Sequence, residues 1–268
     1  MAMFNRLRTL FNPENRGSAP AIPAGRRVYA VGDVHGRIDL FEAMIAAIEA
    51  DDAACRPAQT TVIQLGDLVD RGPDSAGVIT AARHWQQQRD LRILLGNHEE
   101  MLLRALDSDE VMRHFLRWGG RETIMSYLGE PGEYHRADLA GARALMQAAI
   151  PEEDLDFIRS FEDKITIGDY LFVHAGVHPD LPLDEQKTRD LRWIREPFLS
   201  HRESFGAVVV HGHTIADKPQ LKHNRIGLDT GAYRSGRLTA IGLQGTARWL
   251  IEAYDNDGTI AVSIWDLA

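Results

Sequence analysis

Aspartate, asparagine and histidine side chains recur in this sequence directly after short apolar runs. Glycine flanks each group, as in GDVHG, GDLVDRG and GNHE, and lets the backbone turn sharply there. In an open α/β sheet the ligand crevice lies beyond the carboxyl ends of the strands. We therefore expect one sheet to bring these side chains to one place. The residues are Asp33, His35, Asp67, Asp70, Asn97, His98, His174, His211 and His213.

Six of these residues are candidate metal ligands. Their donors are carboxylate and amide oxygens and imidazole nitrogens, which suit a catalytic site for manganese, iron or zinc better than a closed structural zinc site with cysteine. Six ligands exceed the four of one tetrahedral ion, so we expect two divalent ions, with manganese preferred. Two such ions share a carboxylate and a hydroxide and clamp phosphoryl oxygens, and Asp67 is the candidate bridge. The six candidates are Asp33, His35, Asp67, Asn97, His174 and His213.

Three neighbouring residues supply the other groups that phosphoryl transfer needs. The guanidinium of Arg71 matches phosphate oxygens with paired hydrogen bonds, which lysine does less well. His98 titrates near neutral pH and could protonate a leaving alkoxide if Asp70 holds its other ring nitrogen. We therefore expect Asp70 and His98 to act as a pair, with Asp70 supporting the histidine rather than binding metal.

Each of these residues also has a purely structural interpretation. Asn97 could cap a helix, and Asp33 and Asp67 are of a type common in turns. Recurrence at five strand ends favours a common site over these separate explanations. His211 stays open, because it could line the site or orient His213. The other histidines are interpreted as surface or packing residues, namely His84, His114, His135, His178, His201 and His223.

Short apolar runs alternate with helical patterns, which predicts an α/β layered fold. The predicted helices cover residues 40–50 and 75–88. The predicted strands cover residues 27–31, 61–65, 91–95, 170–173, 207–210 and 226–228, followed by a β meander over 238–243, 247–251 and 259–264.

Residues 99–161 have a helical pattern throughout, and we interpret them as an insertion that covers one side of the sheet. The insertion carries several arginines that could meet a phosphorylated substrate or form a solvated helix face. These arginines are Arg104, Arg113, Arg117 and Arg121.

Composition limits the class of protein. With 268 residues and 44% hydrophobic content, we expect one domain over 27–268, preceded by a flexible leader and linker over 1–26. A net charge of −9 argues against nucleic acid as a partner. The single cysteine excludes an internal disulfide and favours the cytoplasm. No apolar run reaches the ~18 residues of a membrane span, and no pattern specifies an oligomer.

Five motifs, in order, resemble those of the calcineurin-like metallophosphoesterases. They are GDVHG at 32–36, GDLVDRG at 66–72, GNHE at 96–99, HAG at 174–176 and GHT at 212–214. The resemblance covers roughly residues 28–233 and is greatest to the phosphoprotein phosphatase branch, in particular the bacterial and phage-type serine/threonine phosphatases. It implies a β sandwich of two mixed sheets flanked by helices.

The resemblance also implies a role for each matching residue. The first metal ion is held by Asp33, His35 and Asp67. The second ion is held by Asp67, Asn97, His174 and His213. His98 becomes the general acid, supported by Asp70, while Arg71 and Asn97 contact the substrate phosphate. A second phosphate-binding arginine is expected, for which Arg195 is the best match and Arg192 the reserve.

The function implied is that of a metal-dependent phosphomonoesterase. It would hydrolyse phosphoserine and phosphothreonine in proteins through a metal-bridging hydroxide, or act on a phosphorylated small molecule. The tail LDTGAYRSGRLTAIGL at 228–243 also resembles symmetrical dinucleoside tetraphosphatases, so cleavage of diadenosine tetraphosphate to two ADP is the alternative. The tetraphosphatase pattern lacks the aspartate of DRG at 70–72.

Two further classes fit the motifs less well. Nucleases of the superfamily continue the last motif as GHxH, whereas here Ile215 follows Thr214. A binding protein without turnover would not need the complete ligand set together with His98 and Arg71.

Overall fold

The structure, a computed structural model, describes residues 19–128 and 132–267. Residues 1–18 of the leader predicted over 1–26 therefore lie outside the described residues. The part of it that is described packs on the domain, because Ile22 is buried and its N–H donates to the carbonyl of Gly245 at 2.8 Å. Among the described residues, none of the helices combines the length and the apolar character that a bilayer span requires.

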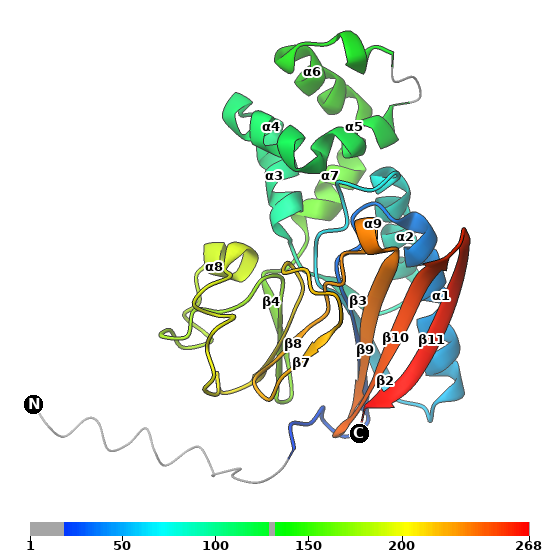
Figure 1. Cartoon of the computed structure of the whole chain (residues 1–268), viewed down its shortest axis with the longest axis vertical. Coiled ribbons are helices and arrows are strands. Elements are labelled where there is room, and N and C mark those ends of the chain that lie inside the picture. The colour runs from blue at the N-terminus through cyan, green and yellow to red at the C-terminus, as the bar shows by residue number, and fades with distance from the viewer. Residues whose placement is uncertain (1–18, 129–131, 268) are drawn as a thin grey trace, which may run out of the picture.

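A six-stranded mixed sheet forms one layer of the domain, in the order β11-β10-β9-β1-β2-β3 (Figure 1). Strands β1, β2 and β3 are parallel, and β9, β10 and β11 extend the sheet as an antiparallel meander. Helices α1 (Ile38–Ala54) and α2 (Ser75–Gln88) connect the parallel strands. The strands are β1 Arg26–Val31, β2 Gln59–Gln64, β3 Leu91–Ile93, β9 Arg237–Gln244, β10 Ala247–Asn256 and β11 Thr259–Leu267.

A five-stranded mixed sheet forms the second layer, in the order β4-β5-β6-β8-β7. Strands β5, β6 and β8 are parallel, and β4 and β7 pair antiparallel at the two edges. Helix α8 (Thr188–Trp193) packs on the outer face of this sheet through Leu191. The strands are β4 Lys164–Ile167, β5 Tyr170–Val173, β6 Val208–His211, β7 Gln220–Leu221 and β8 Arg225–Gly227.

The core between the two sheets follows from the alternation of side chains along each strand. In β1, Val28 and Ala30 face the second sheet, whereas Tyr29 and Val31 pack against the helices on the other side. Both faces of this strand are apolar, so both need a covering layer. The two mixed sheets flanked by helices confirm the predicted fold class. The expectation of a single sheet was wrong, because the candidate residues follow strands of both layers.

Seven helical segments lie between β3 and β4 in the described residues. They pack on one another and on α2, and Phe115 and Ile124 are fully buried among them. The segments are α3 Asn97–Ala105, α4 Asp109–Phe115, the π-helical turn η1 Leu116–Gly120, α5 Arg121–Tyr127, the short η2 Tyr134–Arg136, α6 Leu139–Ala149 and α7 Glu152–Arg159.

These segments stand beyond the strand ends rather than on a sheet face (Figure 1), so the prediction that they cover one side of the sheet was wrong. The reason is that α3 begins at Asn97, directly after the turn that ends β3, and leads the chain away from the sheet edge. The helical segments therefore form a roof over the site where the strands end.

Candidate metal centre

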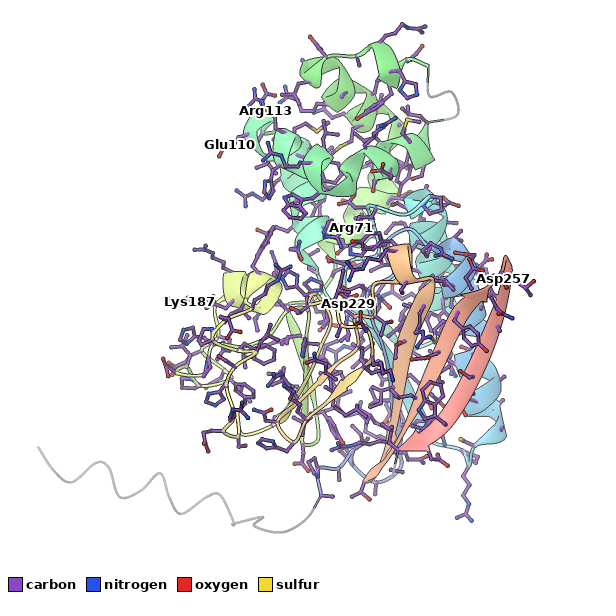
Figure 2. The ribbon with its side chains drawn as sticks, viewed as in Figure 1. Arg71, Glu110, Arg113, Lys187, Asp229 and Asp257 are labelled. Atoms are coloured by element: carbon purple, nitrogen blue, oxygen red, sulfur yellow. The ribbon has the colours of Figure 1, made fainter. Side chains whose placement is uncertain are left out.

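The loops that follow β1, β2, β3, β5 and β6 converge below the helical roof. Figure 2 shows Arg71 and Asp229 close to this junction of the roof with the two sheets. A pocket of about 510 Å³ opens there. Its lining residues are Asp67, Arg71, Asn97, His98, Met101, His114, Trp118, Trp193, Arg195, Glu196 and His213.

Asp67 lies between two groups of candidate ligands. Its Oδ2 is 3.6 Å from Nε2 of His35, and its Oδ1 is 3.4 Å from Nε2 of His174. Asn97 Oδ1 lies 3.0 Å from the same His174 nitrogen and 2.7 Å from Nδ1 of His213. Each carboxylate oxygen of Asp67 thus faces a different group, which is the arrangement that a residue shared by two ions requires.

Backbone carbonyls orient two of the histidines. Nδ1 of His35 donates to the carbonyl of Val69 at 2.8 Å, and Nδ1 of His174 donates to that of Leu65 at 2.7 Å. The Nε2 atom of each ring therefore keeps its lone pair on the side of Asp67, and that of His35 also accepts from the guanidinium of Arg71 at 2.8 Å. Hydrogen bonds of this kind set the tautomer and the direction of a metal-binding imidazole.

The electrostatics of the group favour the protonation states of metal ligands. Burial opposes the ionised form of Asp67, but the surrounding histidines, His174 first, outweigh it and lower the pKa of Asp67. Burial and then the neighbouring His174 lower the pKa of His213 to about 3. An ionised carboxylate beside neutral imidazoles is the combination that binds a divalent cation.

Asp33 contacts this group through His213 and is affected by the charge of Asp229, a residue that the sequence analysis missed. Its Oδ2 accepts the N–H of His213 at 2.9 Å, and burial followed by the charge of Asp229 raises its pKa. Asp33 Oδ1 and Asp229 Oδ2 are both buried, and neither has a hydrogen-bond partner among the described residues. Orphaned carboxylate oxygens of this kind fit a site for cations. Asp229 could have been found, because it follows β8 as the candidate ligands follow their strands.

Glu99 holds two of the ligand loops together, and the sequence analysis gave it no role. Its carboxylate accepts the backbone N–H groups of Asp67, Leu68 and Val69 after β2 and of Gly96 after β3, at 2.7 to 3.2 Å. The side chain is fully buried. Four donors from two loops fix the position of Asp67 relative to Asn97.

His98 and Asp70 lie in contact, as the expected support of His98 by Asp70 requires. Nδ1 of His98 donates to Oδ2 of Asp70 at 2.6 Å, and Thr123 in the roof donates to Oδ1 of Asp70 at 2.6 Å. Burial disfavours the imidazolium of His98, but the carboxylates of Asp67 and Asp70 outweigh it and raise the pKa of His98. Arg71 reaches Nε2 of His98 at 2.7 Å.

The loop that carries Asp70 and Arg71 has an unusual backbone. Both residues have a φ of 72°, in the left-handed region that costs a non-glycine residue of order 1 kcal/mol or more. The roof holds this conformation, because the N–H of Arg71 donates to the carbonyl of Gly119 at 3.0 Å and the N–H of Asp70 donates to Thr123 at 2.9 Å. Gly119 itself has a φ of 106°, and a Cβ there would lie 2.7 Å from the Arg71 nitrogen.

The sequence pattern of the calcineurin-like phosphoesterases matches residues 26–232, well over half of the chain. The chain belongs to this family. The resemblance seen in the motifs is thereby confirmed, and the protein is a metal-binding hydrolase of the metallophosphoesterase type. Its oxygen and imidazole donors fit the dinuclear centre of such enzymes.

Relatives within the calcineurin-like phosphoesterases have different names. Serine/threonine-protein phosphatase 1 of Salmonella typhimurium is 28% identical over 82% of this chain and 93% of its own length. An asymmetrical bis(5'-nucleosyl)-tetraphosphatase of Anoxybacillus flavithermus is 25% identical over 79% of this chain and 88% of its length. A symmetrical one from an Acidovorax species is 32% identical, but over 59% of this chain and 47% of its length.

A solved structure supports the fold of a calcineurin-like phosphoesterase. A crystal structure assigned as a diadenosine tetraphosphatase superposes with a TM-score of 0.59 at 22% identity, covering 92% of this chain and 98% of the other. At this identity the similarity shows the fold alone.

Three residues whose roles the sequence left undecided lie in different environments in this phosphoesterase. Arg195 lines the pocket, whereas Arg192 is paired with Asp163 at 2.6 Å and with Glu100 at 3.6 Å. His211 is buried against Phe198, with ring centroids 5.0 Å apart, and its Nδ1 contacts the carbonyl of Gly212. His211 therefore packs beneath the site, and its ring contacts the carbonyl directly before His213.

Removing the hydroxyl of Thr123 should slow turnover without removing metal. In Thr123→Val, Asp70 loses one donor at its carboxylate and one of the two acceptors of its N–H, the other being the hydroxyl of Ser75, so it holds His98 less firmly. We expect kcat on a phosphothreonine peptide to fall about tenfold, because an unsatisfied buried partner costs about 1–3 kcal/mol. Thr123→Ser keeps the hydroxyl and should recover most of the rate. Equal losses in the two variants would assign the effect to packing instead.

Proposed function

We propose that this protein is a metal-dependent phosphomonoesterase that hydrolyses phosphoserine and phosphothreonine in proteins. The observation that carries the proposal is the buried pair of His98 and Asp70 beside Arg71 at the pocket. A serine or threonine alkoxide is a far more basic leaving group than a nucleoside diphosphate, so its departure needs a proton donor. A histidine held by a carboxylate on one nitrogen supplies that donor.

We assign the proposed ligands to two ions according to which carboxylate oxygen of Asp67 they lie near. One ion is held by Asp33, His35 and Asp67, and the other by Asp67, Asn97, His174 and His213. When bound, the ions lower the pKa of water and stabilise charge on phosphoryl oxygens. The preference for manganese over iron or zinc, and the cytoplasmic location, stay predictions from the donor set and the single cysteine.

The side chains of the pocket do the rest of the chemistry in this proposal. Arg71, Arg195 and Asn97 bind the phosphate and hold it against the ligand groups. The carboxylate of Asp70 keeps the His98 ring turned toward the pocket, where Nε2 delivers the proton to the leaving oxygen.

A second candidate function, symmetrical cleavage of diadenosine tetraphosphate, has its own supporting observation. Trp118 and Trp193 line the same pocket, and Trp118 is 48% exposed. Exposed tryptophan faces stack on nucleobases and stabilise binding by about 1–3 kcal/mol per base. The tail at 228–243 resembles tetraphosphatases and therefore also favours cleavage of diadenosine tetraphosphate.

Product analysis distinguishes the two functions. Manganese-loaded protein is given a phosphothreonine peptide and diadenosine tetraphosphate in parallel, with Asp67→Asn as the blank. We expect faster release of phosphate from the peptide. Clean conversion of the dinucleotide to two ADP, with the peptide nearly untouched, would reject the phosphatase proposal in favour of the second candidate.

A further inference from the structure

We propose that Arg104, Arg113 and Arg117 form a subsite for a second anionic group on the same substrate. Resting on the proposed function, this inference specifies a phosphoprotein segment that carries acidic or phosphorylated side chains near the residue being dephosphorylated. We name these three arginines the roof subsite.

The roof subsite is continuous with the catalytic pocket. It lines a second pocket of about 420 Å³ between α3, α4, η1 and α8. Met101, His114 and Trp193 line both pockets. A substrate bound at the candidate metal centre can therefore extend over these three side chains into the second pocket.

The charge of the roof subsite contrasts with that of the whole chain, which carries a net charge of −9. Arg113 and Arg117 are exposed, and neither forms an ion pair within the described ranges. Arg104 is 64% exposed and forms an ion pair with Glu100 at 3.4 Å, so the unpaired cations of the roof subsite are Arg113 and Arg117. Glu110 is the one carboxylate among the described residues that line this pocket. Unpaired cations in a cleft concentrate positive potential there.

The position of the roof subsite is also fixed relative to the loop that carries Asp70 and Arg71. Arg113 and Arg117 are one helical turn apart on α4 and η1, and Figure 2 shows Arg113 and Glu110 on α4 at the outer edge of the roof. Two residues after Arg117, the carbonyl of Gly119 accepts the N–H of Arg71. A fixed distance between the two sites reduces the ordering cost when a substrate contacts both.

The separation of the two pockets favours a peptide as the occupant. In a dinucleotide, the phosphate next to the scissile one is joined through a single oxygen, so it stays in the catalytic pocket. The roof subsite lies in the second pocket, which shares Met101 and Trp193 with the catalytic pocket, so we expect a group that reaches it to be carried several atoms away from the scissile phosphate. Side chains of an extended peptide meet this need, because each residue advances the chain by about 3.3 Å.

Kinetics with two phosphothreonine peptides test the roof subsite. One peptide has neutral residues on both sides of the phosphothreonine, and the other has aspartate and glutamate there. We expect wild-type protein to have the higher kcat/KM on the acidic peptide. In the double variant Arg113→Gln/Arg117→Gln, the acidic-to-neutral ratio should fall about three- to tenfold, which corresponds to about 0.6–1.4 kcal/mol for the loss of two partly exposed charge pairs.

Two further variants control for general effects of charge. Arg136→Gln removes an exposed arginine of η2 that lines neither pocket, and it should leave the ratio unchanged. Glu110→Gln removes the opposing carboxylate and should raise the ratio. A wild-type ratio near one, or a double variant that slows both peptides equally, would overturn the subsite.

The failure of this inference is distinguishable from failure of the proposed function. If neither peptide is hydrolysed while diadenosine tetraphosphate is, the phosphatase proposal itself is wrong. If both peptides are hydrolysed at equal rates by all variants, the phosphatase proposal stands and the roof subsite is rejected. Loss of dinucleotide cleavage alone in the double variant would reassign the arginines to a nucleotide and overturn the peptide occupant.

Discussion

Asp67→Asn should abolish turnover and reduce the number of metal ions that the protein retains. Asp67 faces His35 with one carboxylate oxygen and His174 with the other, and the amide group replaces one oxygen by an NH₂ that binds no metal. Substitutions beyond the ligands already cost 10–100-fold. For a shared ligand we expect a loss of more than about 100-fold. Metal content after gel filtration is measured beside the rate.

The chain offers a matched control for this variant. Asp257 lies in a hairpin turn far from the site (Figure 2) and has a φ of 52°, close to the 53° of Asp67. Asparagine tolerates this conformation, so Asp257→Asn should keep both the rate and the metal content. Two metal ions per chain and a wild-type rate in Asp67→Asn would rule out the shared ligand.

His98→Asn should keep the metal ions and lose rate mainly on substrates with poor leaving groups. General acid catalysis typically contributes 10²–10⁴-fold, and a phosphothreonine peptide needs it more than p-nitrophenyl phosphate, whose leaving group is a good one. The backbone N–H of His98 donates to Asp67 at 3.1 Å, and this contact survives the substitution. We therefore expect an intact ligand geometry with a slow release of the alkoxide.

This variant also separates two roles that the geometry allows for His98. The ring lies in a group with His35 and Asp67 whose donor atoms are within 4.8 Å of one another, so a metal-ligand role is the competing explanation. Loss of one metal ion in His98→Asn would support that role. Equal losses on the two substrates would contradict the general-acid role, and His135→Asn on exposed η2 is the neutral control.

Helix caps, apolar runs and turn residues predicted the helices and strands that depend on neighbouring residues alone. Helix α2 begins at Ser75 and ends at Gln88 as predicted, because Asp74 caps it by accepting the N–H of Gly77. The strands of the first sheet were found to within a few residues, since their apolar runs are bounded by turn residues. Strand β4 was missed, because Lys164 and Thr166 interrupt its apolar pattern after a long helical stretch.

The candidate ligands were also predictable, because each stands within one to four residues after a strand end. A parallel strand followed by a glycine turn places such a side chain at the carboxyl edge of its sheet. The sequence by itself thus identified the candidate ligands from Asp33 to His213, though not Asp229, and the family to which the chain belongs.

Only the tertiary structure decided how these residues are held and what surrounds them. Thr123 and Gly119 support Asp70 and Arg71 from about fifty residues away in sequence. The choice between Arg195 and Arg192 depends on the ion pair of Arg192 with Asp163. Such contacts leave no periodic signal in the chain, because they arise only when separate elements pack. The position of the helical roof, and with it the cationic pocket beside the site, follows from that packing.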